Sequence, residues 1–250
     1  MIILKSPEEV EKIRASCQIV ADALQHLEKV VEPGITTLEL NDIAEQFLME
    51  RGAAPAFKGY RGFPMSLCAS INEEVVHGIP SAKRKLQEGD VISLDLGSLY
   101  EGYYGDAAIT VGVEKITESA KKLLAVTRTS LESGLREVRE NNWLSDISHA
   151  IQTAVEREGF SVVRIFVGHG IGTSLHEEPQ IPNFGPPGRG PRLKEGMVLA
   201  VEPMVNVGTS DVRILDDNWT VVTQDGSLSA HFEHTVAVTK DGCDVLSRFH

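Results

Sequence analysis

The chain has 250 residues, of which 42% are hydrophobic and 24% are charged, and these fractions are ordinary for a globular protein. Its formal net charge of −12 argues against nucleic acid as a partner, because nucleic-acid binding requires a basic face. The first residues have too short an apolar run for a signal peptide, and no apolar stretch reaches membrane-spanning length. We therefore expect a cytoplasmic protein without a membrane partner.

The cysteines Cys17, Cys68 and Cys243 are odd in number and widely spaced, and none belongs to a Cys-x-x-Cys pair. This usage predicts free thiols rather than a disulfide framework or a zinc ribbon. Cys17 recurs with apolar residues at helical spacing, so we expect it in the core.

Helix signals come in two pairs. Ser6 followed by Pro7 is a favourable helix start, and apolar residues recur at helical spacing as far as Leu27. The four expected helices span residues 6–33, 36–52, 117–139 and 143–159. Packing against a sheet explains all four, so we assign them no chemistry.

Residues 53–80 are rich in glycine, proline and aromatic residues. Such a loop either covers an edge of the core or lines a pocket. His77 precedes Gly-Ile-Pro at an expected turn, where an imidazole is available for hydrogen bonding or acid–base chemistry. A surface histidine is the alternative interpretation.

Residues 91–97 are apolar almost throughout, which predicts a buried strand. Asp95 interrupts this run, and an ionised carboxylate is costly to bury unless a partner or a metal balances it. After a Gly/Tyr turn at 101–105, Asp106 opens a second apolar run at 106–113. We predict a β-hairpin that directs two carboxylates at one point, although each acid alone could simply cap a turn.

Residues 162–179 form another segment dense in polar groups. His169 lies between glycines after an apolar run, and His176 follows seven positions later, too far for the helical zinc pair. The two imidazoles can share a site if the turn folds back. The Gly-x-Gly run lacks the lysine of a phosphate-binding loop, so we discount a nucleotide site.

Several short patterns occur twice in the same order, which indicates an internal duplication. Residues 87–95 resemble 194–202, 106–111 resemble 233–238, 77–80 resemble 176–179, and 40–44 resemble 144–148. We infer two pseudo-equivalent halves, roughly 1–115 and 120–250, related by a pseudo-twofold axis. The strands would bring four acids together: Asp95, Asp106, Glu202 and Glu233. Like charges raise one another's pKa strongly, so cations must lie between them.

These motifs together resemble those of type I methionine aminopeptidases over nearly the whole chain. The matching residues are His77-Gly-Ile-Pro, Asp95, Gly105-Asp106, Gly168-His169-Gly, His176-Glu-Glu-Pro, Glu202-Pro and Glu233-His-Thr. The resemblance implies the α+β pita-bread fold, a curved central antiparallel sheet flanked by helices. It also implies a single catalytic domain over 1–250 and a monomer.

The resemblance assigns a role to each polar residue. It implies that two divalent metal ions (Co, Mn, Fe or Zn) are bound by Asp95, Asp106, His169, Glu202 and Glu233, with Asp106 and Glu233 bridging. Glu202 also shuttles a proton from the attacking water to the leaving amine. His77 and His176 are the remaining catalytic residues, which hydrogen-bond the substrate amide and the developing oxyanion.

The resemblance also assigns the pocket for the methionine side chain, which aromatic and sulfur surroundings match. Its expected lining is Tyr60, Phe63, Cys68 and Trp219. The chain departs from the family at Leu175, where phenylalanine is more frequent, and at Gly97, where relatives often carry threonine. The first departure bears on the pocket wall, and the second on one hydrogen bond beside the metal ligands.

The implied function is removal of the N-terminal methionine from nascent polypeptides at the ribosome, with preference for a small second residue. A prolidase or aminopeptidase P shares the five ligands, but those proteins usually carry an additional N-terminal domain. Binding proteins of the same fold tend to lose ligands, and all five are present here. A metal-dependent regulator of nucleic acid conflicts with the acidic charge.

Overall fold

The computed structural model describes residues 1–249. Its α-helices are α1 (Pro7–Val30), α2 (Thr37–Glu50), α3 (Glu118–Leu135) and α4 (Leu144–Arg157). The 53–112 region contains β1 (Ala54–Pro55), the short 3₁₀ helix η1 (Tyr60–Gly62), β2 (Leu67–Ile71), β3 (Glu74–Val76), β4 (Val91–Tyr100) and β5 (Tyr103–Gly112). The later strands are β6 (Ser161–Val162), β7 (Gly168–Gly170), β8 (Glu177–Ile181), β9 (Val198–Val201), β10 (Met204–Asn206), β11 (Val212–Ile214), β12 (Val221–Thr223), β13 (Ser229–His231), β14 (Glu233–Val238) and β15 (Cys243–Val245).

The four helices lie where the sequence predicts them, and local capping explains where they begin. Ser6 caps α1, and the carboxylate of Glu9 accepts a hydrogen bond from the Ser6 backbone in return, which forms a capping box. Thr36 and Glu39 make the same box at α2. The helices end earlier than expected at their C-terminal sides, and α1 stops three residues before Pro33.

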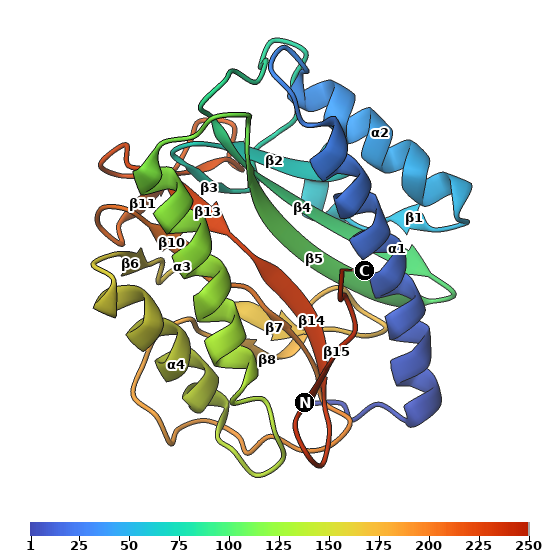
Figure 1. Cartoon of the computed structure of the whole chain (residues 1–250). Coiled ribbons are helices and arrows are strands. Elements are labelled where there is room, and N and C mark those ends of the chain that lie inside the picture. The colour runs from blue at the N-terminus through green and yellow to red at the C-terminus, as the bar shows by residue number, and fades with distance from the viewer. Residues whose placement is uncertain (250) are drawn as a thin grey trace.

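The strands of the main sheet are antiparallel and occur in the order β1-β4-β5-β14-β9-β7-β8, with β2 also paired to β4 and β15 to β14. Figure 1 shows the long curved β4, β5 and β14 at its centre, with α1 and α2 beside one part of the sheet and α3 and α4 beside the other. The predicted α+β architecture with a central antiparallel sheet is confirmed.

The β4–β5 hairpin is longer than the sequence predicts. Its pairing continues beyond Gly97 to Tyr100 opposite Tyr103, so the turn is reduced to Glu101 and Gly102. Both turn residues have positive φ, 49° and 83°, as a tight two-residue hairpin turn requires. The extra pairs extend the hairpin as one stiff unit beyond the position of Asp106.

The expectation of a loop throughout 53–80 is wrong for β2. Leu67–Ile71 pairs with β4 along its length, with Cys68 opposite Asp95. The small residues Cys68, Ala69 and Ser70 hide the strand signal, because they lack the branched and aromatic side chains typical of strands. The segment is therefore anchored to the strand that carries Asp95.

Strand alternation assigns the two faces of the sheet. Leu94 and Leu96 are fully buried in the main core with residues of the helices, so Asp95 between them points to the other face. On β5, an added Cβ on Gly105 would lie 2.5 Å from the backbone nitrogen of Cys17 in α1. Asp106 therefore points away from α1, to the same face as Asp95.

The three cysteines are free, as expected, and Cys17 is fully buried in the core. Burial raises the pKa of the Cys17 thiol to about 12. Among the helices of residues 1–249, none is long and apolar enough to cross a membrane.

The contact of Gly105 with α1 leads to a stability prediction. Gly105→Ala should lower the free energy of unfolding by about 1–3 kcal/mol, because the added methyl group meets helix backbone that cannot move aside. Gly242→Ala is the matched control, since an added Cβ there has no neighbour within 4 Å. Urea denaturation of the metal-free proteins measures both changes. Equal stability of the two variants would contradict this packing account.

Candidate active site

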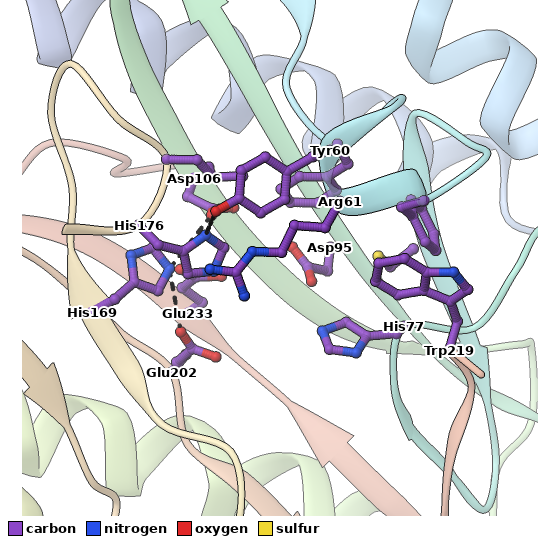
Figure 2. A pocket seen from close by; sticks show the side chains of 14 residues that line it. Tyr60, Arg61, His77, Asp95, Asp106, His169, His176, Glu202, Trp219 and Glu233 are labelled. Carbon is purple, nitrogen blue, oxygen red and sulfur yellow. Dashed lines mark hydrogen bonds and ion pairs between the residues drawn. The ribbon is translucent and has the colours of Figure 1, made fainter. Parts of the chain in front are cut away.

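A cavity of about 150 Å³ opens on the sheet face opposite α1. Its lining contains every residue that the sequence predicts for the site: Tyr60, Phe63, Cys68, His77, Asp95, Asp106, His169, His176, Glu202, Trp219 and Glu233. Figure 2 shows that the acids gather with His169 and His176 at one side of the cavity, and that Trp219 lies at the other side with His77 beside it. The structure therefore brings together residues that lie up to 173 positions apart, from Tyr60 to Glu233.

Sheet register brings the acids together. Asp95 on β4 and Glu233 on β14 are both paired with Ala108 of β5, one from each side. Asp106 lies two residues before Ala108 and so shares its face. Glu202 follows β9, which is the next strand beyond β14. Strand order thus places the four carboxylates in a row across the sheet.

The acidic side of the cavity has the donor set of a metal site. Asp106, His169 and Glu233 each offer a ligand atom, and these atoms lie within 4.8 Å of one another. Within residues 1–249, the buried oxygens Asp95 Oδ1, Asp106 Oδ1 and Glu233 Oε1 have no hydrogen-bond partner. Buried carboxylate oxygens without protein partners, together with one imidazole, fit a divalent cation of hard to borderline character.

A backbone contact sets the tautomer of His169. Its Nδ1 lies 2.9 Å from the carbonyl oxygen of Gly170, which can only accept a hydrogen bond. Nδ1 therefore carries the proton, and Nε2 presents a lone pair. Nε2 lies 3.5 Å from Glu202 Oε1 and 3.9 Å from Asp106 Oδ2, so the lone pair points into the acidic cluster.

The electrostatics of the cluster favour a bound cation. Burial, followed by repulsion from neighbouring carboxylates, raises the pKa of Asp106, Glu202 and Glu233 well above the ordinary range. Burial raises the pKa of Asp95 to about 7. Without cations the carboxylates therefore cannot all ionise near neutral pH.

The two other predicted histidines flank this cluster. His176 Nδ1 lies 2.9 Å from the Tyr60 hydroxyl oxygen, and the two rings stack with centroids 5.2 Å apart (Figure 2). His77 meets Phe166 and Trp219 edge-on at centroid distances of 5.5 and 6.1 Å. Burial lowers the pKa of His77 to about 4 and that of His176 to about 3, with a smaller effect from a neighbouring histidine in each case and from Arg61 at His176. Both imidazoles are therefore neutral.

A buried ion pair supports the loop that carries His176. Lys5, from the segment before α1, places its Nζ 2.5 Å from Glu177 Oε2. The other oxygen of Glu177 accepts a hydrogen bond from the Ser174 backbone. Sequence analysis assigned no role to Lys5, because its partner is 172 residues away in the chain.

The apolar wall of the cavity explains one departure from the family pattern. The ring of Phe57 occupies the space beside Gly97, so an added Cβ there would lie 2.5 Å from Phe57 Cε1. A threonine at position 97 therefore requires the Phe57 ring to shift or a smaller residue at position 57. Leu175, the other departure, is buried and lines the cavity together with Phe63.

Two polar residues in or beside the cavity were not identified from the sequence. Arg61 lines the cavity from the 3₁₀ helix and extends across it in Figure 2. His231 is 2% exposed, and its Nε2 lies 3.9 Å from Glu202 Oε2. Its position two residues before Glu233 was the available signal, because alternate residues of an extended segment share a face.

Residues 11–240 match the model of metallopeptidase family M24. The chain is 56% identical over 248 residues to methionine aminopeptidase 1 of Bacillus subtilis, covering 99% of this chain and 100% of that protein. It superposes on the crystal structure of methionine aminopeptidase from Rickettsia prowazekii with a TM-score of 0.98 and 41% identity, covering 99% of this chain and 100% of that one.

A more distant structure shares the fold alone. The prolidase of Pyrococcus horikoshii OT3 matches with a TM-score of 0.80 at 21% identity, over 100% of this chain and 65% of that chain. These matches confirm the predicted pita-bread fold, the resemblance and the assignment as an aminopeptidase enzyme. The chain therefore belongs to metallopeptidase family M24 and, within it, to the methionine aminopeptidases.

Proposed function

We propose that this chain removes the N-terminal methionine from peptides and nascent proteins, using two divalent metal ions. The observation that carries the proposal is one cavity with acids, His169 and His176 at one side and an apolar, partly aromatic wall with His77 at the other. The acidic side can hold cations and a free α-amine. The apolar side, with Phe63, Cys68 and Trp219, suits an unbranched thioether.

The residues that would hold the ions in this proposal are Asp95, Asp106, His169, Glu202 and Glu233. Unpartnered oxygens on three of these acids and the tautomer of His169 support the assignment. Cobalt, manganese, iron and zinc are all compatible with oxygen ligands and one imidazole. Bound divalent ions would supply Lewis-acid polarisation of the scissile carbonyl and lower the pKa of the attacking water.

The protein's own groups move the protons in this reaction. Glu202 accepts a proton from the attacking water and passes it to the leaving amine. His77 and His176 are neutral and each can donate one N–H to the substrate amide or to the developing oxyanion. The Tyr60 hydroxyl holds His176 in place.

The proposal includes substrate selection. The cavity has a volume of only about 150 Å³, so we propose a preference for a small residue after the scissile bond. The proposed partners are the N-termini of nascent polypeptides at the ribosome, and the proposed location is the cytoplasm. We also propose that the chain is a monomer with one catalytic domain built from two halves. The strand order β4-β5-β14-β9 supports the two halves, because the second pair of strands mirrors the first.

The proposed reaction can be tested on a peptide panel after the metal-free protein is reloaded separately with Mn(II), Fe(II), Co(II) or Zn(II). We expect free methionine from Met-Ala-Ser but not from its acetylated form, and slower release from Met-Lys-Ser. Ala-Ala-Ser and an X-Pro peptide are the specificity controls. Cleavage of the X-Pro peptide alone would assign a prolidase activity, and metal binding without any cleavage would overturn the enzymatic proposal.

The metal and histidine roles should separate on substitution. Asp106→Asn should lower the bound Mn(II) from two ions to at most one per chain and abolish turnover, because a buried carboxylate ligand is lost. His176→Ala should lower kcat by about 10²–10³-fold with metal content unchanged. His149→Ala, an exposed histidine of α4 away from the cavity, is the control. Metal analysis and initial rates give the result; loss of metal in His176→Ala would make that residue a ligand.

Metal affinity should rise with pH. The raised carboxylate pKa values mean that the metal-free folded chain binds more protons than the unfolded chain, so its stability falls as pH rises from about 4 through about 7. Metal binding expels these protons, so the increase in Tm caused by Mn(II) should be larger at pH 8 than at pH 5. Thermal unfolding with and without Mn(II) measures this increase. An equal increase at both pH values would contradict the assignment of these acids as ligands.

A further inference from the structure

His231 is a buried polar residue that the proposed reaction does not yet use. Its side chain is almost completely inaccessible, and among residues 1–249 neither ring nitrogen has a hydrogen-bond partner. A buried imidazole without partners is costly, because it has lost water without replacing the hydrogen bonds. Such a group requires an explanation from its surroundings.

The backbone of His231 is held in one position by Thr110. The Thr110 hydroxyl accepts a hydrogen bond from the His231 N–H at 2.8 Å and donates to its carbonyl oxygen at 2.7 Å. Ser93 therefore donates its own hydroxyl proton to Thr110 Oγ1, 2.8 Å away. Ser93 lies two residues before Asp95 and Thr110 four residues after Asp106, on the same faces of their strands. These hydrogen bonds thus fix the His231 backbone relative to the two strands that carry Asp95 and Asp106.

The carboxylate of Glu202 lies beside this imidazole. Glu202 Oε2 lies 3.9 Å from His231 Nε2, whereas its Oε1 lies 3.5 Å from His169 Nε2. The carboxylate therefore has one oxygen toward the proposed metal ligand and the other toward His231. A shift of about 1 Å would bring His231 Nε2 and Glu202 Oε2 to hydrogen-bond distance. Asn183 holds the other end of the residue, donating to the Glu202 carbonyl oxygen at 3.0 Å.

We propose that His231 is a positioning residue that donates its Nε2–H to Glu202 Oε2 and so orients Glu202 Oε1 toward the metal ions. This inference rests on the proposed function, because it acts through Glu202. A partner that orients a ligating carboxylate restricts its rotation and raises metal affinity. It also leaves Oε1 as the oxygen that faces the reaction.

Two amide substitutions test which ring nitrogen matters. In His231→Gln the side-chain NH₂ falls near the position of Nε2, whereas in His231→Asn it falls near Nδ1 and does not reach Glu202. His231→Met fills a similar volume without a donor and serves as a second variant that cannot donate. Mn(II) titration calorimetry, together with kcat and KM for Met-Ala-Ser, compares the three with the unchanged chain.

We expect His231→Asn and His231→Met to weaken Mn(II) binding by about 10–100-fold and to lower kcat more than they change KM. His231→Gln should weaken Mn(II) binding by less than about 10-fold, because its amide can still donate to Glu202. Thermal unfolding of the metal-free proteins identifies a variant that does not fold. Either His231→Asn or His231→Met alone is enough for the test, because neither can donate to Glu202. Equal losses of Mn(II) affinity in all three variants would mean that His231 acts only by packing, which would overturn the inference. Unchanged Mn(II) binding in folded His231→Asn or His231→Met would also overturn it. If the unchanged chain binds Mn(II) but releases no methionine, the proposed function fails while the calorimetric comparison still decides the role of His231.

Discussion

The structure depends on the burial of four carboxylates around one point of the sheet. Asp106, Glu202 and Glu233 repel one another at low exposure, and three buried carboxylate oxygens among residues 1–249 lack protein partners. A fold can retain such a cluster only if something else provides the compensating charge. The metallopeptidase family supplies the physical reason, because divalent cations are the natural compensation. The four buried carboxylates therefore destabilise the metal-free protein, and bound cations would remove this destabilisation.

Rigid secondary structure supports this cluster from beneath. The hairpin of β4 and β5 is long and tightly turned, β2 is paired along β4, and α1 is packed closely against Gly105. The hydroxyls of Ser93 and Thr110 connect this hairpin to the strand that precedes Glu233. Residues whose positions are set by such pairings hold a reactive geometry better than residues on loops. The loop that carries His176 is the exception, and the ion pair of Lys5 with Glu177 compensates for it.

Neighbouring residues also adjust to one another at the cavity wall. Gly97 has no side chain where the family resemblance suggests threonine, and the ring of Phe57 fills the space. Tyr60 contacts His176 by both a hydrogen bond and ring stacking, so a residue expected only to line the pocket also holds a proposed catalytic group. The side chains of the cavity wall therefore also help to set the position of a polar group, as Tyr60 does for His176.

The sequence alone determined the helices, the β-hairpin, the four acids and the histidines His77, His169 and His176, because each leaves a local signal. Capping residues mark α1 and α2, and an acid inside an apolar run is conspicuous at Asp95. The repeated patterns predicted two halves, and that duplication stays a prediction. The strand β2 was missed because its small residues carry little strand signal. Only the tertiary structure decided how Lys5 meets Glu177 and how His231 meets Glu202, since contacts between distant segments depend on strand order and register rather than on local pattern.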